Sequence, residues 1–370
     1  METVKPAMEK MVSNMFKNCF AGKRILITGN TGFKGSWLTL WLQTLGAEVT
    51  GYALDPDTLP SHWDLLELDV NHVSADVRNE QMLRSVIEKT SPHLIFHLAA
   101  QPLVRASYNN PAYTWETNVM GTVNLLNASR DISSLLGIVV ITTDKVYSNP
   151  ETGVPFKENE PLGAGDPYSS SKAACELVIE SFSKSFFADE APIIASCRAG
   201  NVIGGGDWAT DRLIPDIVKS MVNGSPLDIR YPQAVRPWQH VLDSLSGYLC
   251  LAQKMIEGDK RACDAWNFGP HIQDNFSVEN ILTTMKSFWP ELVWNVSQNN
   301  PLHEAKLLRL DCEKAKSQLQ WQPVWNFNDT ARHTALWYQS FYANGYVSSE
   351  EQLKQYQQDA LDKGVIWACS

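Results

Sequence analysis

Short apolar runs alternate with helical periodicities over the first 200 residues of the chain. Between the runs, apolar residues recur every three to four positions, which is typical of helices that bury one face. The clearest helical segments are 79–90, 113–130 and 168–187. This alternation predicts an α/β fold with a doubly wound parallel sheet. The apolar runs that predict strands are 23–28, 48–54, 71–75, 94–100, 137–143 and 192–198.

The pattern becomes less regular after about Gly200. Loops rich in Gly, Pro and Trp separate the predicted elements there. We expect an N-terminal extension over 1–15, an α/β domain over 16–200 and a smaller, mixed domain over 201–370. Some elements of the last domain are expected to return to the α/β domain. The elements predicted after Gly200 are helices at 214–222, 241–257 and 327–344 and strands at 227–230 and 266–268.

A glycine-rich turn joins the first predicted strand to the first predicted helix, with glycines at 29, 32 and 35. A strand, a tight glycine turn and a helix are typical of Rossmann-type dinucleotide binding, because the turn lets a diphosphate reach the helix N-terminus. Asp55 ends the next strand, about 20 residues after Gly35, where a carboxylate can bind the ribose hydroxyls. Lys34 could favour a 2′-phosphate, but Asp55 repels one. We therefore expect NAD.

Further cofactor contacts are expected at the carboxyl ends of the strands, which meet at one edge of a parallel sheet. Asp76 follows the third predicted strand, and the small residues at 98–100 would let the backbone pass close to a cofactor. Asn118 is a polar residue within an apolar helix. The expected cofactor contacts are Gly29, Thr31, Gly32, Phe33, Lys34, Gly35, Asp55, Asp76, Val77, Leu98, Ala99, Ala100, Gln101, Asn118, Thr142, Tyr168 and Lys172.

Tyr168 and Lys172 lie four residues apart in a predicted helix, so both side chains occupy one helix face. A phenol with its ordinary pKa of about 10 is a poor base. A neighbouring ammonium and a positively charged nicotinamide ring would favour the phenolate and make Tyr168 a usable general base. The spacing alone is common on helix surfaces. Here it follows a strand that ends in the polar sequence Thr-Thr-Asp-Lys at 142–145.

Composition narrows the choice of function. A net charge of −10 disfavours a nucleic-acid surface, because phosphate contacts need clustered Lys and Arg. The 7 cysteines are dispersed without a C-x-x-C pair and the 8 histidines are scattered, so we expect reduced thiols, a cytoplasmic protein and no metal site. No apolar run reaches the length of a membrane span, so we expect no membrane partner.

Taken together, these motifs resemble the extended short-chain dehydrogenase/reductase family over nearly the whole chain after about Phe16. Within it the chain is similar to the nucleotide-sugar 4,6-dehydratases, most of all to their CDP-glucose branch. The common sugar dehydratases carry Asp-Glu where this chain has Asp144-Lys145, which favours that branch. The motifs that carry the resemblance are Thr-Gly-Asn-Thr-Gly-Phe-Lys-Gly-Ser-Trp (28–37), Thr-Thr-Asp-Lys-Val-Tyr (142–147), Tyr-x-x-x-Lys (168–172), Arg-Ala-Gly-Asn-Val-Ile-Gly-Gly-Gly-Asp-Trp (198–208) and Arg-Pro-Trp-Gln-His-Val (236–241).

The resemblance implies a reaction that uses NAD catalytically. Tyr168, helped by Lys172 and held near Thr143, would take the proton of the sugar 4-hydroxyl while C4 passes hydride to NAD. The 4-ketone acidifies C5. Asp144 would then protonate the departing 6-hydroxyl, and Lys145 would assist proton removal at C5, directly or through an ordered water. Hydride return to C6 gives a 4-keto-6-deoxy sugar.

The substrate, CDP-glucose, is expected to lie against the later half of the chain. Arg236 and Arg309 are candidates for its diphosphate, because a guanidinium can bind through two N–H groups. Trp208 and Trp238 are interpreted mainly as packing residues. We expect a homodimer or homotetramer, with a dimer formed through the helices near 113–130 and 168–187. The expected substrate contacts are Arg105, Arg198, Asn201, Leu213, Arg236, His240 and Arg309.

Two other classes of function remain open. A nucleotide-sugar 4-epimerase, or a dehydratase for another nucleotide, would use much of the same machinery. An epimerase needs no general acid at C6, so Asp144 and Lys145 argue against it. A non-catalytic dinucleotide-binding regulator would typically lose Tyr168 or Lys172, and both are present.

Overall fold

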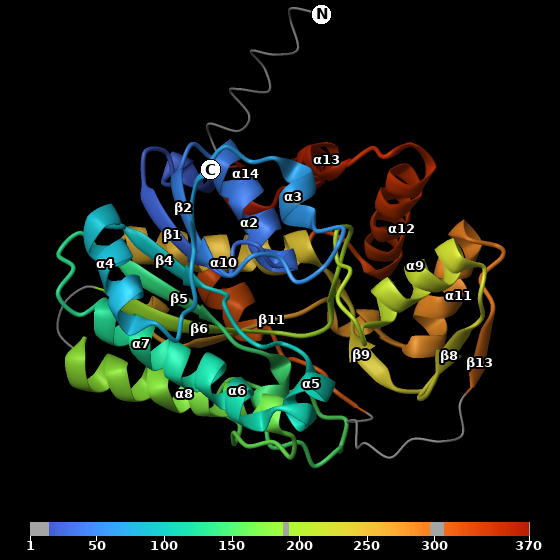
Figure 1. The fold of residues 1–370 in the computed structure, drawn as a ribbon, viewed down its shortest axis with the longest axis horizontal. Coiled ribbons are helices and arrows are strands. Elements are labelled where there is room, and N and C mark those ends of the chain that lie inside the picture. The colour runs from blue at the N-terminus through green and yellow to red at the C-terminus, as the bar shows by residue number, and fades with distance from the viewer. Residues whose placement is uncertain (1–14, 188–191, 297–306, 370) are drawn as a thin grey trace, which may run out of the picture.

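The computed structural model describes residues 15–187, 192–296 and 307–369. A seven-stranded parallel sheet with the order β11-β6-β5-β4-β1-β2-β3 forms its centre (Figure 1). The predicted doubly wound parallel sheet is thus confirmed. The strands are β1 (Arg24–Thr28), β2 (Glu48–Ala53), β3 (Asn71–Ser74), β4 (Leu94–His97), β5 (Gly137–Ile141), β6 (Ile193–Ala199) and β11 (Ala265–Phe268).

Helices cover both faces of this sheet and enclose two separate cores (Figure 1). Leu26 of β1 packs in the core formed with α4 (Glu80–Thr90), α7 (Gly121–Ala128) and α8 (Pro167–Phe186). Its neighbours Ile25 and Ile27 pack in the opposite core, formed with α2 (Phe33–Thr44) and α10 (Val241–Ile256). Because successive side chains of a strand point to opposite faces, both sets must be apolar. This explains the continuous apolar runs in the sequence.

Two strands end two or more residues earlier than the sequence predicts. β4 stops at His97 rather than at residue 100, because side chains take over the hydrogen bonds of the backbone that follows. The N–H of Ala99 donates to Thr28 Oγ1, and the N–H of Gln101 donates to Asn118 Oδ1. β5 stops at Ile141 and leads into the short helix η3 (Asp144–Val146). The irregular backbone therefore lies at the carboxyl edge of the sheet, where ligands bind in this class of fold.

The region after Gly200 adds short strand pairs and helices, which lie to the right in Figure 1. The predicted strand at 266–268 is β11, which pairs with β6 and so returns to the large sheet. The division into domains stays a prediction. The strands are β7 (Val202–Ile203), β8 (Leu227–Ile229), β9 (Val235–Pro237), β10 (Gln239–His240), β12 (Asn275–Ser277) and β13 (Trp294–Val296), and the helices are α9 (Leu213–Asn223), α11 (Val278–Phe288) and α12 (Phe327–Asn344).

The two ends of the described chain pack against each other. Phe16 in η1 (Met15–Asn18) stacks on Trp367 in α14 (Ile366–Cys369), with ring centroids 4.9 Å apart. Of the predicted extension, residues 1–14 lie outside the described residues, while Met15 is buried in the core. The remaining elements are α3 (His62–Leu66), α5 (Val104–Asn109), α6 (Pro111–Trp115), the π-helical turn η2 (Glu116–Met120), η4 (Lys260–Ala262), η5 (Ile272–Asp274), η6 (Ala315–Leu319) and α13 (Ser349–Asp362).

Within the described residues, no helix combines the length and apolar character that a membrane span requires. Clusters of His, Cys, Asp and Glu side chains that could hold a metal ion are also absent from this part of the chain.

Candidate active site

A cavity of about 1380 Å³ opens at the carboxyl edge of the sheet, between the α/β part and the later part of the chain. The turns after β1, β2, β4 and β5 form one wall, and segments around β7, α9 and β9 form the other. The cavity brings together most of the predicted site residues. These are Gly29, Thr31, Gly32, Phe33, Lys34, Gly35, Asp55, Asp76, Val77, Leu98, Ala99, Ala100, Gln101, Arg105, Thr142, Thr143, Asp144, Lys145, Tyr168, Lys172, Asn201, Leu213 and Arg236.

The glycine turn has the geometry that a dinucleotide requires. Gly29 has a φ of +74°, and a Cβ there would lie 2.6 Å from the backbone nitrogen of Ala99. A Cβ on Gly35 would lie 2.1 Å from the carbonyl oxygen of Gly29. Both positions therefore need glycine, and the tight turn brings Gly32, the N-cap of α2, to the cavity wall. A diphosphate fits at such a helix N-terminus, where backbone N–H groups point outward.

Carboxylates follow β2 and β3 along the same wall. Asp55 Oδ1 accepts a hydrogen bond from Ser74 Oγ at 2.8 Å. Asp76 binds the guanidinium of Arg78 (2.7 Å), and this hydrogen bond lowers the pKa of Asp76. Lys34 instead donates to the hydroxyl of Tyr248 on α10 (3.4 Å). The ammonium of Lys34 therefore binds a side chain of α10. Asp55 remains the residue that we expect to select NAD over NADP.

Tyr168 lies in the first turn of α8 and is buried at the cavity wall. Burial raises its pKa to about 12, while a hydrogen bond with Thr143 and the charge of Arg212 oppose this rise. Lys172 donates to the carbonyl oxygen of Ile141 (2.9 Å). Lys172 and Tyr168 both line the cavity, and the role of Lys172 beside the phenol stays a prediction. Thr143 and Arg212 are further groups that favour the phenolate.

Asp144 and Lys145 begin η3, immediately after Thr143. Asp144 Oδ1 accepts from Thr143 Oγ1 (3.1 Å), and Oδ2 is buried with no hydrogen-bond partner among the described residues. Burial raises the pKa of Asp144, against the opposing effects of Lys145 and the Thr143 hydrogen bond. Lys145 Nζ lies 5.9 Å from the centroid of the Tyr168 ring. The structure therefore places a buried carboxyl group with a raised pKa close to a candidate base.

Four predicted site residues do not line the cavity. Asn118 holds the β4–α5 loop, since its amide accepts from the Gln101 N–H and donates to Ser171 Oγ (2.8 Å) on α8. Arg309 follows Leu308, which lines the cavity, and its carbonyl oxygen accepts from the Phe156 N–H. Asn118 thus positions neighbours of the cavity.

The prediction that Arg198 and His240 contact the substrate has to be corrected, because neither side chain lines the cavity. The guanidinium of Arg198 is buried against Glu176 at 2.8 Å, behind the cavity wall. His240 is fully buried, caps α10 by accepting from the Leu242 N–H (3.3 Å) and packs edge-on against Trp325. Burial holds the pKa of His240 well below its usual value. Both side chains therefore make their contacts in the protein interior.

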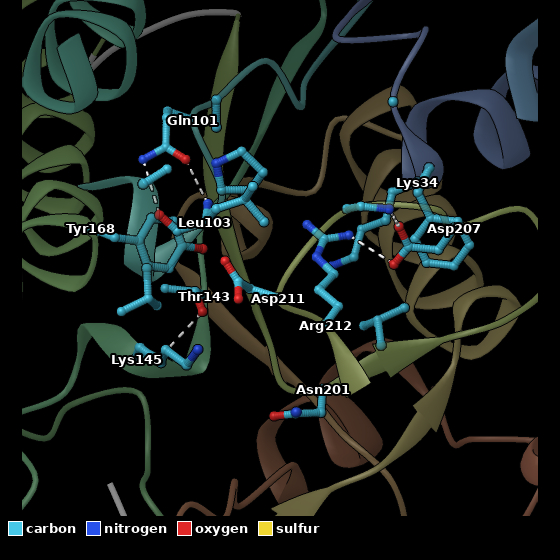
Figure 2. A pocket seen from close by; sticks show the side chains of 18 of the residues that line it. Lys34, Gln101, Leu103, Thr143, Lys145, Tyr168, Asn201, Asp207, Asp211 and Arg212 are labelled. Atoms are coloured by element: carbon cyan, nitrogen blue, oxygen red, sulfur yellow. Dashed lines mark hydrogen bonds and ion pairs between the residues drawn. The ribbon is translucent and has the colours of Figure 1, made fainter. Parts of the chain in front are cut away.

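Two cavity-lining ion pairs contain residues that are not among the predicted site residues: Asp207, Asp211 and Arg212. Arg212 Nη1 binds Asp207 Oδ2 (2.9 Å), and Figure 2 shows this pair beside Lys34, across from Tyr168. Arg105 on α5 binds Asp211 (2.8 Å) on the opposite wall. Asp207 lies in the 198–208 motif, but Arg212 falls beyond it. The ion pair with Asp207 holds Arg212, whose charge acts on Tyr168 of α8, and no local pattern could have singled this residue out.

The glycine turn, the parallel sheet and the polar cluster at its carboxyl edge are those of a dinucleotide-binding α/β protein. A family model described as GDP-mannose 4,6 dehydratase matches residues 26–334. The chain belongs to this family. It is 46% identical over 334 residues to a Salmonella typhimurium protein named CDP-glucose 4,6-dehydratase, covering 88% of this chain and 93% of that protein.

More distant relatives share the fold. A UDP-glucose 4-epimerase from Mycoplasma pneumoniae is 25% identical over 86% of this chain and 97% of its own length. The solved structure of a dTDP-glucose 4,6-dehydratase from Bacillus anthracis in complex with NAD superposes with a TM-score of 0.71 at 22% identity, covering 86% of this chain and 97% of that chain. These likenesses at low identity establish the architecture.

Proposed function

We propose that this chain is an NAD-dependent nucleotide-sugar 4,6-dehydratase that converts CDP-glucose to CDP-4-keto-6-deoxy-glucose. The observation that carries the proposal is the buried carboxyl of Asp144, whose pKa is raised by burial and which lines one cavity with Lys145 and Tyr168. A carboxyl group that can donate a proton, beside a candidate base, suits the elimination of water. The 46% identity to the Salmonella CDP-glucose 4,6-dehydratase supports this choice of reaction and nucleotide.

NAD bound along the glycine turn would supply a hydride acceptor at C4 and later a hydride donor to C6. Tyr168 takes the proton of the 4-hydroxyl, and the hydrogen bond with Thr143 stabilises the phenolate that does so. Arg212 adds a positive charge on the same side. Because burial raises the pKa of Tyr168, the phenolate depends on such neighbours.

The elimination depends on the two residues after Thr143. The 4-ketone makes the hydrogen at C5 acidic, and Lys145 assists its removal, directly or through a water. Asp144 delivers its proton to the 6-hydroxyl as that group departs as water. Burial raises the pKa of this carboxyl, which is the direction that a general acid needs.

The nucleotide diphosphate is proposed to bind the later part of the chain. Leu213 begins α9 and lines the cavity, so the free N–H groups at the start of this helix are candidates for a diphosphate oxygen. Arg236 on β9 lines the same wall and offers a guanidinium, while Asn201 and Arg105 border the cavity. Arg309 is kept as a candidate for the diphosphate because Leu308, its neighbour in sequence, reaches the cavity wall. We further propose a cytoplasmic homodimer or homotetramer.

Incubation of the purified protein with NAD and CDP-, dTDP-, UDP- or GDP-glucose tests the proposal. We expect the base-labile absorbance of a 4-keto-6-deoxy sugar with CDP-glucose and little with the other three. Inversion at C4 with the 6-hydroxyl retained would identify an epimerase. Absence of turnover with all four, from a protein that binds NAD, would favour a regulator.

A further inference from the structure

A buried ion pair lies directly behind the catalytic wall of the cavity. Arg198 Nη2 on β6 binds Glu176 Oε2 on α8 at 2.8 Å, and both side chains are only 4% exposed. Neither residue lines the cavity. Glu176 follows Lys172 by four positions on α8, so it lies one helical turn away on the same face. The pair is therefore fixed to the helix that carries Tyr168.

One end of the pair binds the start of the segment 142–147. Thr142 Oγ1 donates to Glu176 Oε1 at 2.5 Å, and Thr142 is the first residue after β5. Ser196 on β6 donates to the other oxygen, Oε2, at 2.7 Å. With Arg198, these donors occupy both oxygens of the carboxylate, as a buried charge requires.

The other end of the pair binds the end of the same segment. Arg198 Nη1 donates to the hydroxyl of Tyr147 at 2.9 Å, and that hydroxyl donates to Asn267 Oδ1 at 2.7 Å. The Tyr147 ring stacks on Phe156 with centroids 4.8 Å apart, and the Arg198 guanidinium lies 5.0 Å from its centroid. Thus one ion pair holds residues 142 and 147 at once. Between them lie Thr143, Asp144 and Lys145.

We propose that the Glu176–Arg198 pair is a positioning unit for the segment 142–147. Through its contacts to Thr142 and Tyr147, it keeps Asp144 and Lys145 at the correct position relative to Tyr168. The inference rests on the proposed function, because it assigns the elimination to Asp144 and Lys145 and the C4 oxidation to Tyr168 on α8, which uses only Thr143 of the segment. Loosening the segment should therefore slow the elimination more than the oxidation. An ion pair that served stability alone would affect both steps equally.

The test variant is Tyr147→Phe, which removes one hydroxyl and keeps the stacked ring. Truncating Arg198 or Glu176 would leave the other charge buried and unpaired, and would destabilise the fold. The matched control is Tyr356→Phe. Tyr356 is also fully buried and makes two hydrogen bonds, to Asp243 (2.7 Å) and Ser246 (3.1 Å), but it does not line the cavity.

Single-turnover experiments on the NAD-loaded enzyme with CDP-glucose separate the two steps. Absorbance of the reduced cofactor follows C4 oxidation, and rapid-quench analysis follows the loss of water. For Tyr147→Phe we expect oxidation within about threefold of wild type and elimination slowed at least about tenfold, since misplacing a catalytic group by 1 Å can cost about 100-fold. Tyr356→Phe should leave the ratio of the two rate constants unchanged.

Thr142→Val provides a second test at the opposite end of the segment. It should shift the ratio in the same direction, measured at NAD concentrations that saturate the variant because Thr142 also lines the cavity. An unchanged ratio in Tyr147→Phe would overturn the positioning inference. A wild-type protein that never oxidises CDP-glucose at C4 would instead overturn the proposed function itself.

Discussion

Replacing Asp144 with Asn tests the elimination step most directly, because the change preserves shape and removes the acidic proton. Asn Oδ1 can still accept from Thr143 Oγ1, which lies 3.1 Å from Asp144 Oδ1. The new amide nitrogen takes the place of Oδ2, an atom without a hydrogen-bond partner among the described residues. The fold and the oxidation machinery should therefore survive. Only the proton donor to the 6-hydroxyl is lost.

The expected loss follows from the burial of this side chain. A positioned general acid contributes about 100- to 10,000-fold, which corresponds to about 3 to 5 kcal/mol of activation free energy. Asp144 is 2% exposed, so bulk water cannot readily replace it as a donor. We therefore expect a loss of about 1,000-fold or more in the elimination. An ionised Asp144 raises the pKa of Tyr168, so a neutral amide at this position should not impair the phenolate.

Single-turnover analysis with CDP-glucose deuterated at C5 provides the assay. Asp144→Asn should accumulate reduced cofactor, retain some exchange at C5 and release almost no 4-keto-6-deoxy sugar. The matched control is Asp216→Asn. The carboxyl of Asp216 lies at the cavity wall, burial raises its pKa to about 6, and it has no proposed role. Normal product release by the Asp144 variant would refute the assignment. In wild type, elimination should also slow as the pH rises through the raised pKa of Asp144.

Four further outcomes are expected. Tyr168→Phe should abolish cofactor reduction while nucleotide-sugar affinity, measured by calorimetry, stays within about threefold; near-normal turnover would require another base. Lys145→Met should slow deuterium exchange at C5 by about tenfold or more, and unchanged exchange would remove it from that step. NAD should bind at least about tenfold better than NADP, a preference that Asp55→Ala should erase in a titration. Burial raises the pKa of Asp243 to about 7 from 3.8, so its contribution to stability, complete below pH 3.8, is lost as the pH rises to 7. The wild-type free energy of unfolding should therefore fall by up to about 1.4 kcal/mol per pH unit in that window, and chemical denaturation of Asp243→Asn should show a flatter profile.

Local patterns were sufficient where the chemistry depends on neighbours in sequence. The glycine turn could be predicted because Gly29 and Gly35 contact backbone only a few residues away or on the adjacent strand end. Asp144 could be placed because it directly follows a strand, and parallel strands end at the same edge.

Contacts between residues far apart in the sequence explain the features of the site that the sequence could not predict. Arg198 occupies a family motif, but its partner Glu176 lies 22 positions away on another element, and that contact turns the guanidinium from the cavity. Arg212 lies outside every motif named above. Its ion pair with Asp207 and the nearby α8 determine its position. Charged side chains carry no local signal of which partner will bury them. Their roles depend on how the elements pack.

The chain passes repeatedly between the two walls of the cavity. After β6 it builds β7 to β10 on the substrate side, returns with α10 and β11, crosses again to β12 and α11, and ends with α13 and α14 beside η1. No single cut in the sequence therefore separates a cofactor half from a substrate half. Efforts to alter nucleotide preference by grafting a contiguous C-terminal piece from a relative would also exchange a sheet strand and a core helix. Exchange of nucleotide preference between these enzymes, in the laboratory or in evolution, therefore has to replace separate groups of residues around α9 and β9.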